Sequence, residues 1–323
     1  PFFWDYFRSF ANRRKSAIDN GVTTIRSAGD NYPHIIQLRR KIEAGKLTGP
    51  RILAAGPIFT GPGGHPAGTI YKRNRYIVEH ATRQVNDTKG AREEVRKLAE
   101  GGVDCIKAVY SKMNPMDLTH EVPQLALNVL EAIVDEAHKY YLKVMVHTGS
   151  PNDIRDAVNV GADSIEHGIL PGRDSTEFQD YVIRMMRDRG TYYVPTLAIA
   201  WAGKKMYPDM LADSQKALKQ LHDEGIKIAL GTDSGAPGVV IGKAVHKELE
   251  LMVETGLSPM EAIMAGTKNA ADNLGKGSQL GTIEEGKLAD MIVVSKDPSK
   301  DITNTIGINL VIKDGKILVN RLD

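Results

Sequence analysis

The sequence predicts an α/β protein, a (β/α)8 barrel of the TIM type with a small β-sandwich appendage. Short β-rich runs alternate with helical patterns over most of the 323 residues, which is typical of parallel strands covered by helices. Polar residues capable of chemistry stand at the ends of several of these runs, as they do in barrels. After about residue 275 the chain becomes Gly-rich and then β-rich. We therefore expect a barrel domain over 1–275 and half of a small β-sandwich over 276–323.

Seven strand candidates precede the appendage, one fewer than a closed barrel requires. They are Val22–Ser27, Arg51–Ala55, Cys105–Tyr110, Val144–Thr148, Ser164–His167, Tyr192–Leu197 and Ile226–Gly231. Either the sheet is open, or one strand lies upstream of Pro1. An open, doubly wound sheet that binds nucleotides would carry a GxGxxG turn or a GxxxxGK[ST] loop, and neither occurs. We expect the second, an upstream segment that carries the first strand.

The helices between and after these strands have recognisable starts and stops. The predicted helices are Ala91–Glu100, Gln124–Tyr140, Asp209–Glu224, Lys243–Thr255 and Pro259–Asn273. Ser258 before Pro259, with Glu261 three residues on, predicts a capping box at the start of the last one. In the appendage we expect a strand at Met291–Val294 and a hairpin around Asp314-Gly315.

Composition excludes several classes of function. Lys and Arg number 42 against 40 Asp and Glu, so bulk charge does not favour nucleic-acid binding. No apolar run approaches the roughly 18 residues of a transmembrane helix. Cys105 is the only cysteine, which excludes an intrachain disulfide and thiolate zinc sites. We expect a cytoplasmic homo-oligomer that acts on a small-molecule substrate and binds neither nucleic acid nor membrane.

Four residues at strand ends form the candidate site. Lys107, His147 and His167 end or nearly end their strand candidates, and Asp233 follows another. They are separated by one or more strand–helix repeats, so all four side chains are expected to point into one mouth of the barrel. Two histidines and a carboxylate are suitable ligands for Zn²⁺.

Lys107 admits two interpretations at this position. A free ammonium repels a metal and is costly inside a barrel. A carbamate formed with CO₂ would instead offer two oxygens that bridge two metals. The alternative is a structural salt bridge, for example to Glu166.

Five motifs in this order make the chain similar to a known family. They are "IK" at Lys107, "VHTG" at His147, "DSIEHG" at His167, "GTDSG" at Asp233 and the tail "GTIEEGKLADMIVV". The sequence resembles the amidohydrolase superfamily of metal-dependent hydrolases, in its imidazolonepropionase-like and Xaa-Pro dipeptidase (prolidase-like) branch. "VTTIRSAG" and "GPRILAAGPIFTGPGGH" match that branch too. The resemblance runs from about Gly21 to the C-terminus.

The resemblance implies a binuclear zinc centre, with two Zn²⁺ ions or another divalent metal. It makes Lys107 the bridging carboxylated lysine, His147 and His167 ligands of one metal, and Asp233 a ligand of the other. The family's first strand ends in His-x-His, which supplies two further ligands, and this sequence contains no His-x-His. His65 falls where this branch has a pocket histidine, and Tyr110 follows the lysine strand. Both are predicted to bind substrate.

The activity implied is hydrolysis of an amide C–N bond of a dipeptide or N-acyl amino acid by water activated between the metals. Asp233 would act as general base and then as general acid. A deaminase, a lactonase or organophosphate hydrolase of the same superfamily, and a catalytically inactive scaffold remain alternatives.

Overall fold

The structure is a computed structural model that describes residues 2–168 and 178–322. Its centre is a parallel sheet with strand order β4-β3-β5-β6-β7-β8. The bounds are β3 Ile58–Thr60, β4 Thr82–Gln84, β5 Cys105–Val109, β6 Lys143–His147, β7 Ser164–Glu166 and β8 Tyr192–Val194. Two further parallel strands, β1 (Thr24–Ser27) and β2 (Arg51–Ala54), pair with each other. The amide of Asp104 donates to the carbonyl of Ala54 at 2.8 Å, which ties β2 to the start of β5.

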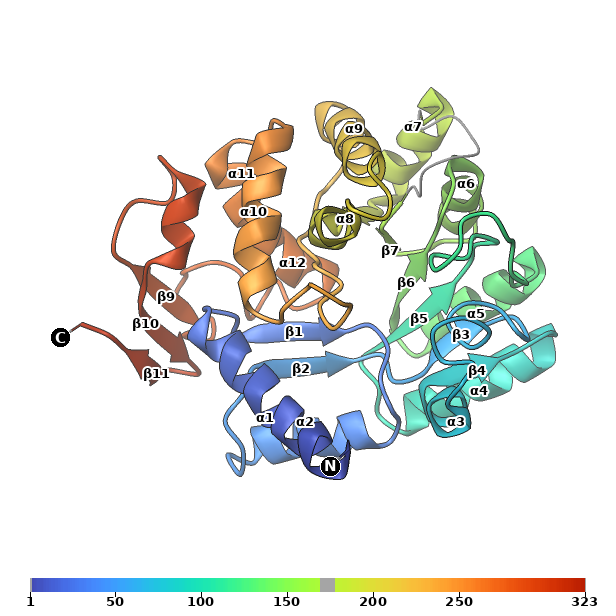
Figure 1. Ribbon diagram of the computed structural model, residues 1–323, viewed down its shortest axis with the longest axis horizontal. Coiled ribbons are helices and arrows are strands. Elements are labelled where there is room, and N and C mark those ends of the chain that lie inside the picture. Colours follow the sequence, from blue (N-terminus) through green and yellow to red (C-terminus); the bar gives the residue numbers. More distant parts are fainter. Residues whose placement is uncertain (1, 169–177, 323) are drawn as a thin grey trace.

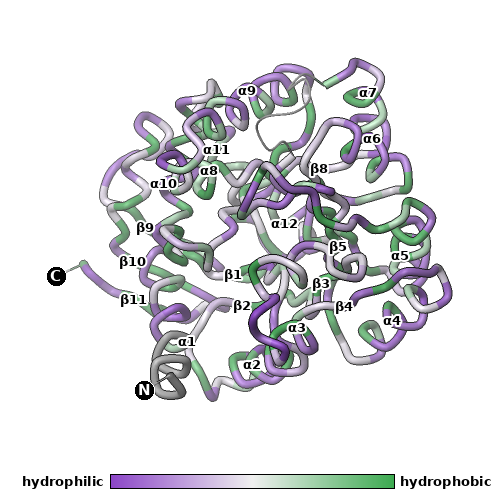
Figure 2. Tube along the Cα trace, turned by 45° about the vertical axis from the view of Figure 1, so that its right-hand side comes forward, coloured by the Kyte–Doolittle hydropathy of each residue, from purple (hydrophilic) through white to green (hydrophobic). Residues whose placement is uncertain are grey.

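Helices surround these strands on the outside (Figure 1). The α-helices that follow strands β1 to β8 are α2 His34–Glu43, α3 Arg75–Ala81, α4 Thr88–Glu100, α5 Leu127–Lys139, α6 Pro151–Asn159, α7 Asp180–Arg189, α8 Leu197–Gly203, α9 Met210–Asp223, α10 Lys243–Thr255, α11 Pro259–Gly266 and α12 Lys268–Asn273. Along α4 and α5 the hydropathy changes from turn to turn (Figure 2), as in amphipathic helices whose apolar stripe faces a sheet. Residues such as Val95, Leu130 and Ile133 are fully buried in this layer.

The predicted helices are present with small shifts of their ends. Lys243–Thr255 is α10 with the predicted bounds. The expected helix Pro259–Asn273 is divided at Thr267 into α11 and α12. The predicted capping box is present, because the Ser258 hydroxyl accepts from the Glu261 amide and the Glu261 carboxylate accepts from the Ser258 amide.

Two strand predictions need correction. The segment Ile226–Gly231 is no regular strand: it pairs with β8 through a single bridge between Ile228 and Tyr193. Two residues later the amide of Leu230 donates to the carbonyl of Ala265 instead of to a neighbouring strand. Conversely, β3 and β4 were not predicted, since each has only three residues and β4 is wholly polar.

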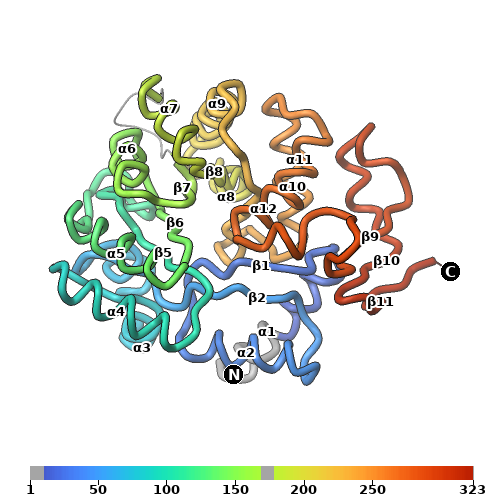
Figure 3. The backbone as a smooth tube through the Cα atoms, turned by 180° about the vertical axis from the view of Figure 1, so that it is seen from behind, coloured from blue at the N-terminus to red at the C-terminus, as the bar shows by residue number. Residues whose placement is uncertain are grey.

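The C-terminal residues form an antiparallel sheet of order β11-β10-β9, with β9 Met291–Val294, β10 Ile308–Lys313 and β11 Lys316–Asn320. The 3₁₀ turn Ile302–Ile306 connects β9 to β10. The expected hairpin joins β10 to β11. This sheet lies beside α1 (Phe2–Asp19) at one side of the molecule (Figure 3), where Ile18, Ile308 and Val311 form a small core of their own. The parallel strands and their helices end with α12 at Asn273 and the antiparallel sheet begins at Met291, and the division into two domains near residue 275 stays a prediction.

Side chains alternate between two faces along the central strands. On β5, Ile106 and Ala108 join the main core under the helices, whereas Cys105 packs with Ala55 and Met145 in a separate cluster. Lys107 lies on the same face of β5 as Cys105 and therefore faces the interior enclosed by the strands. None of the helices in the described part of the chain is long and apolar enough to cross a membrane.

Candidate active site

His147 and His167 meet at the carboxyl ends of two neighbouring strands. His147 is the last residue of β6 and His167 directly follows β7. Their ring centroids are 4.7 Å apart, with an interplanar angle of 64°. The ring of His65, in the loop after β3, also lies beside His147, with a centroid distance of 5.4 Å. The structure thus brings together three of the histidines that the sequence analysis selected.

The tautomer of His167 follows from its hydrogen-bond partner. Its Nδ1 lies 2.7 Å from the Thr196 hydroxyl, and that hydroxyl donates to the Pro195 carbonyl at 2.8 Å. A carbonyl oxygen only accepts, so the single hydroxyl proton is used there and the hydroxyl oxygen must accept from Nδ1–H. This arrangement favours the tautomer of His167 that carries its proton on Nδ1.

Three residues at this edge have a strained backbone. His167, Thr196 and Asp233 have φ values of 68°, 50° and 50°, in the left-handed region that non-glycine residues avoid. Each such residue costs on the order of 1–3 kcal/mol and persists only where its surroundings fix it. His167 and Thr196 follow β7 and β8, and Asp233 follows the irregular segment that contacts β8.

Lys107 lies in the interior below the histidines without a salt bridge to Glu166. Glu166 instead accepts from Arg26 at 2.7 Å and from the Ser164 hydroxyl at 2.6 Å. Burial opposes the ionisation of Glu166, but Arg26 and Lys107 outweigh burial and hold its pKa below the usual value. The salt bridge considered as the alternative role of Lys107 is thus replaced by a pair between Arg26 and Glu166.

Burial governs the protonation of the site. It lowers the pKa of the Lys107 ammonium, although the carboxylates of Glu166 and Asp233 favour the charged form. It also lowers the pKa of His147 well below the usual value, with the charges of His167, His65 and Lys107 acting in the same direction. For His65, burial together with His167 lowers the pKa to about 4. The imidazoles of His65 and His147 are therefore neutral near pH 7.

Asp233 lies at the rim. It follows the segment that contacts β8 and its side chain is exposed. Its carboxylate acts electrostatically on His65, His167 and Lys107. Asp233 is thus near enough to these three groups to influence their charges, and its role as a metal ligand stays a prediction.

Tyr110 is not part of this group. Its hydroxyl donates to the Asp156 carboxylate of α6 at 3.1 Å, and its ring belongs to the main core. Strand alternation explains this, since Tyr110 is three residues beyond Lys107 and so lies on the opposite face. The predicted role of Tyr110 in substrate binding stays a prediction that this geometry does not support.

Comparison with known proteins establishes the family. The sequence profile described as "Amidohydrolase family" matches residues 8–318. The chain belongs to the amidohydrolase family. The imidazolonepropionase of Geobacillus kaustophilus (strain HTA426) is 30% identical over 168 residues, which are 51% of this chain and 36% of that protein. Across eight curated relatives the matched region spans 36–64% of their length.

Solved structures of relatives cover nearly the whole chain. A Xaa-Pro dipeptidase with bound methionine is 30% identical, with a TM-score of 0.80 over 96% of this chain and 78% of that one. A prolidase complexed with N-methylphosphonate-L-proline is 25% identical, with a TM-score of 0.80 over 99% and 81%. These relatives confirm the TIM-type α/β barrel and place this amidohydrolase in the imidazolonepropionase- and prolidase-like branch. Its family uses divalent metals.

The residues present fit such a metal. Nε2 of His147 is buried without a hydrogen-bond partner, which is costly for a polar atom unless something binds it. The ring of His167 lies beside it, and imidazole nitrogen suits Zn²⁺. Within residues 2–168 and 178–322, no three His, Cys, Asp or Glu side chains converge closely enough to hold a metal. Lys107 as a carbamate, or Asp233 after a movement, would supply a third ligand.

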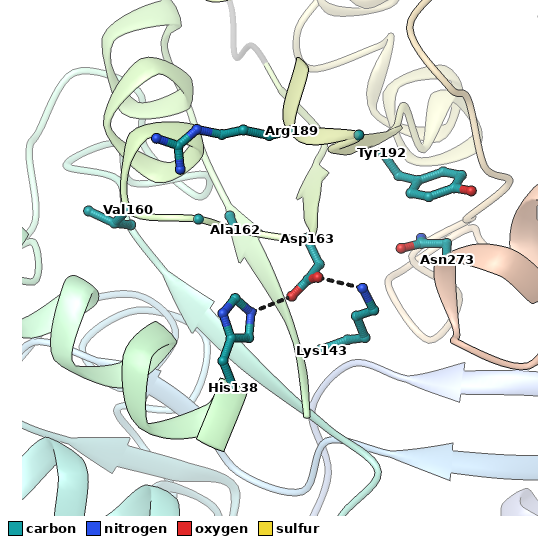
Figure 4. Close-up of a pocket in the computed structure, with 10 residues that line it drawn as sticks. His138, Lys143, Val160, Ala162, Asp163, Arg189, Tyr192 and Asn273 are labelled. Carbon is teal, nitrogen blue, oxygen red and sulfur yellow. Dashed lines mark hydrogen bonds and ion pairs between the residues drawn. The ribbon is translucent and has the colours of Figure 1, made fainter. Parts of the chain in front are cut away.

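A cavity of about 440 Å³ opens at the opposite ends of the strands (Figure 4). Lys143 begins β6 and Asp163 precedes β7, so this cavity is separated from the histidines by the length of the strands. Asp163 accepts from His138 at 2.9 Å, from Lys143 at 2.7 Å and from the amide of Val144 at 2.8 Å. These groups satisfy one another and tie α5 to β6 and β7, a structural role.

Sequence reasoning missed three residues that support the site: Arg26, Thr196 and Glu248. Thr196 stands near the end of the strand candidate Tyr192–Leu197, but a threonine carries no distinctive signal there. Glu248 stands on the apolar face of α10 with Leu251 and Met252, which marks it as a buried acid. The partner of Arg26 lies 140 residues away, beyond the reach of any local pattern.

Proposed function

We propose that this amidohydrolase is a metal-dependent hydrolase of an amide C–N bond in a dipeptide or N-acyl amino acid. The observation that carries the proposal is the pair His147 and His167, whose rings lie 4.7 Å apart at adjacent strand ends, with Nε2 of His147 buried and without a hydrogen-bond partner. Membership of the family and similarity to a Xaa-Pro dipeptidase support the reaction class.

His147, His167, a carboxylated Lys107 and Asp233 would hold divalent metal, Zn²⁺ in the first instance and two ions per chain. When bound, such ions act as Lewis acids on a carbonyl and lower the pKa of water. Burial keeps Lys107 closer to its neutral amine, the form that attacks CO₂ to give a carbamate. Glu166 makes its direct ion pair with Arg26 rather than with Lys107.

The remaining steps fall to side chains at the rim. Asp233 is exposed to the mouth, where it accepts a proton from the attacking water and delivers it to the leaving nitrogen. His65 has its Nδ1 bonded to the Thr69 hydroxyl at 2.6 Å, so its ring is fixed beside His147. With a pKa of about 4 it is neutral, and it contributes a hydrogen bond to the substrate rather than a charge.

The test is metal content and turnover of the purified chain. We expect about two divalent ions per chain and hydrolysis in a screen of dipeptides and N-acyl amino acids. One ion with deamination would favour a deaminase, and turnover confined to esters or phosphotriesters would favour a lactonase or organophosphate hydrolase. Absence of both metal and turnover would identify a scaffold. The cytoplasmic location and the homo-oligomeric state stay predictions.

A further inference from the structure

A buried carboxyl group organises the backbone beside His167. Glu248, on α10, is 0% exposed. Its two carboxyl oxygens accept from the amides of Leu197 and Ala198 at 2.8 and 2.6 Å. These are the first two residues of α8, whose amides have no partner within the helix. α10 thereby fixes a turn that belongs to another element.

That turn contains an unfavourable conformation. Thr196 has φ 50° and ψ 45°, and a β-branched residue in the left-handed region is a genuine outlier. Such a conformation persists only where the surroundings over-determine it. The two amides held by Glu248 directly follow Thr196, and no capping bond comes from the Thr196 side chain itself. Glu248 is therefore the group that holds this turn from its C-terminal side.

The orientation of Thr196 in turn decides the state of His167. Its hydroxyl is held between the Pro195 carbonyl and Nδ1 of His167. If Thr196 relaxed to an ordinary backbone conformation, its side chain would swing away from the imidazole. Nδ1 would lose its acceptor, and the proton could move to Nε2, which removes the lone pair that faces the site.

We propose that Glu248 is a positioning residue that acts through Thr196 to keep His167 in its Nδ1–H tautomer with Nε2 free to bind metal. Its importance for metal rests on the proposed function, whereas its effect on the tautomer does not. Partners that orient a ligating histidine commonly change metal affinity 10–100-fold when removed.

The experiment compares the parent with Glu248→Gln in the metal-free chain. Long-range ¹H–¹⁵N correlation reports the tautomer of each imidazole. We expect a single Nδ1–H tautomer for His167 in the parent and a mixture in Glu248→Gln, because the Gln amide group cannot accept from the second backbone amide. Zn²⁺ affinity, measured by competition with a chromophoric chelator, is expected to fall about 10-fold or more.

Glu136→Gln is the matched control. Glu136 is 4% exposed but lies on α5, where it pairs with Arg92, Arg96 and Lys139. Its substitution is expected to lower the melting temperature without changing the tautomer of His167 or the Zn²⁺ affinity. If Glu248→Gln does not fold, Glu248→Asp, which keeps the carboxylate on a shorter side chain, is measured in its place by the same criteria.

A double-mutant cycle tests the route through Thr196. If Glu248 acts through that residue, Glu248→Gln adds little to the loss of Zn²⁺ affinity caused by Thr196→Val. Additive losses, or an unchanged His167 tautomer in Glu248→Gln, would overturn the proposal. If the parent chain binds no Zn²⁺, the proposed function is contradicted. The tautomer of His167 in the parent and in Glu248→Gln still tests the role of Glu248.

Discussion

The guanidinium of Arg26 lies 2.7 Å from the carboxylate of Glu166, and the two come from strands β1 and β7, which do not pair with each other. Their side chains are only 14% and 7% exposed. Arg26 also donates to the Ser164 hydroxyl at 3.3 Å. The pair spans the interior just below the candidate site and leaves Lys107 without a carboxylate partner there.

Removing Arg26 should therefore have two effects. Arg26→Met leaves a buried, unpaired carboxylate, which typically costs about 3–5 kcal/mol of unfolding free energy. The freed Glu166 is expected to pair with the Lys107 ammonium and so to reduce carboxylation of that lysine. Urea unfolding measures the first effect, and the ¹³C carbamate signal after growth with labelled bicarbonate measures the second.

Arg75→Met is the control for this substitution. Arg75 pairs with Glu79 on the surface of α3, where the two side chains are 92% and 50% exposed. Such pairs contribute about 0.3–0.5 kcal/mol. If the two substitutions lower the unfolding free energy by the same amount, the buried pair between Arg26 and Glu166 contributes no more to stability than a surface pair.

Lys107→Ala should lower the amount of bound metal, because the proposed carbamate supplies ligand oxygens. Short carboxylic acids in the buffer should partly restore metal binding by occupying the vacated space. The measurement is metal content by elemental analysis after gel filtration. Lys143→Ala is the control, since Lys143 begins the neighbouring strand and pairs with Asp163. Parent-like metal content in Lys107→Ala would rule out the carbamate.

The positions of the strand ends could be predicted from sequence because each lies between an apolar run and a Gly-containing turn. That pattern puts His147 and His167 at the ends of successive strands and so predicts that they lie close together. Tyr110 shows its limit, since alternation along β5 turns that side chain toward α6. The bonds of Glu248 to α8 and the pair between Arg26 and Glu166 depend on how distant elements approach, and no local pattern encodes that approach.

Asp233→Asn should lower kcat by about 10²–10⁴-fold, the usual contribution of a general acid–base group. The fold should be unaffected, because none of the side-chain hydrogen bonds among the described residues involves Asp233 and its side chain is exposed. Steady-state kinetics with the best substrate from the screen gives the ratio, and circular dichroism checks the fold. Asp223→Asn, which removes a surface carboxylate paired with Lys219, should stay within a few-fold of the parent. A similar result for Asp233→Asn would assign proton transfer to another group.

Acid should destabilise the metal-free chain through its buried histidines. Burial lowers the pKa of His65 from 6.5 to about 4 in the folded chain. Between these values the unfolded state binds more protons than the folded state, so stability is present above pH 6.5 and is lost as the pH falls toward 4. From pH 7 to pH 5 one such group accounts for about 1–2 kcal/mol of unfolding free energy. His65→Gln should therefore lose less stability than the parent over this interval when both are unfolded by urea at the two pH values. The same loss in both proteins would mean that His65 is protonated as readily in the folded chain as in water, and that its ring is not enclosed beside His147.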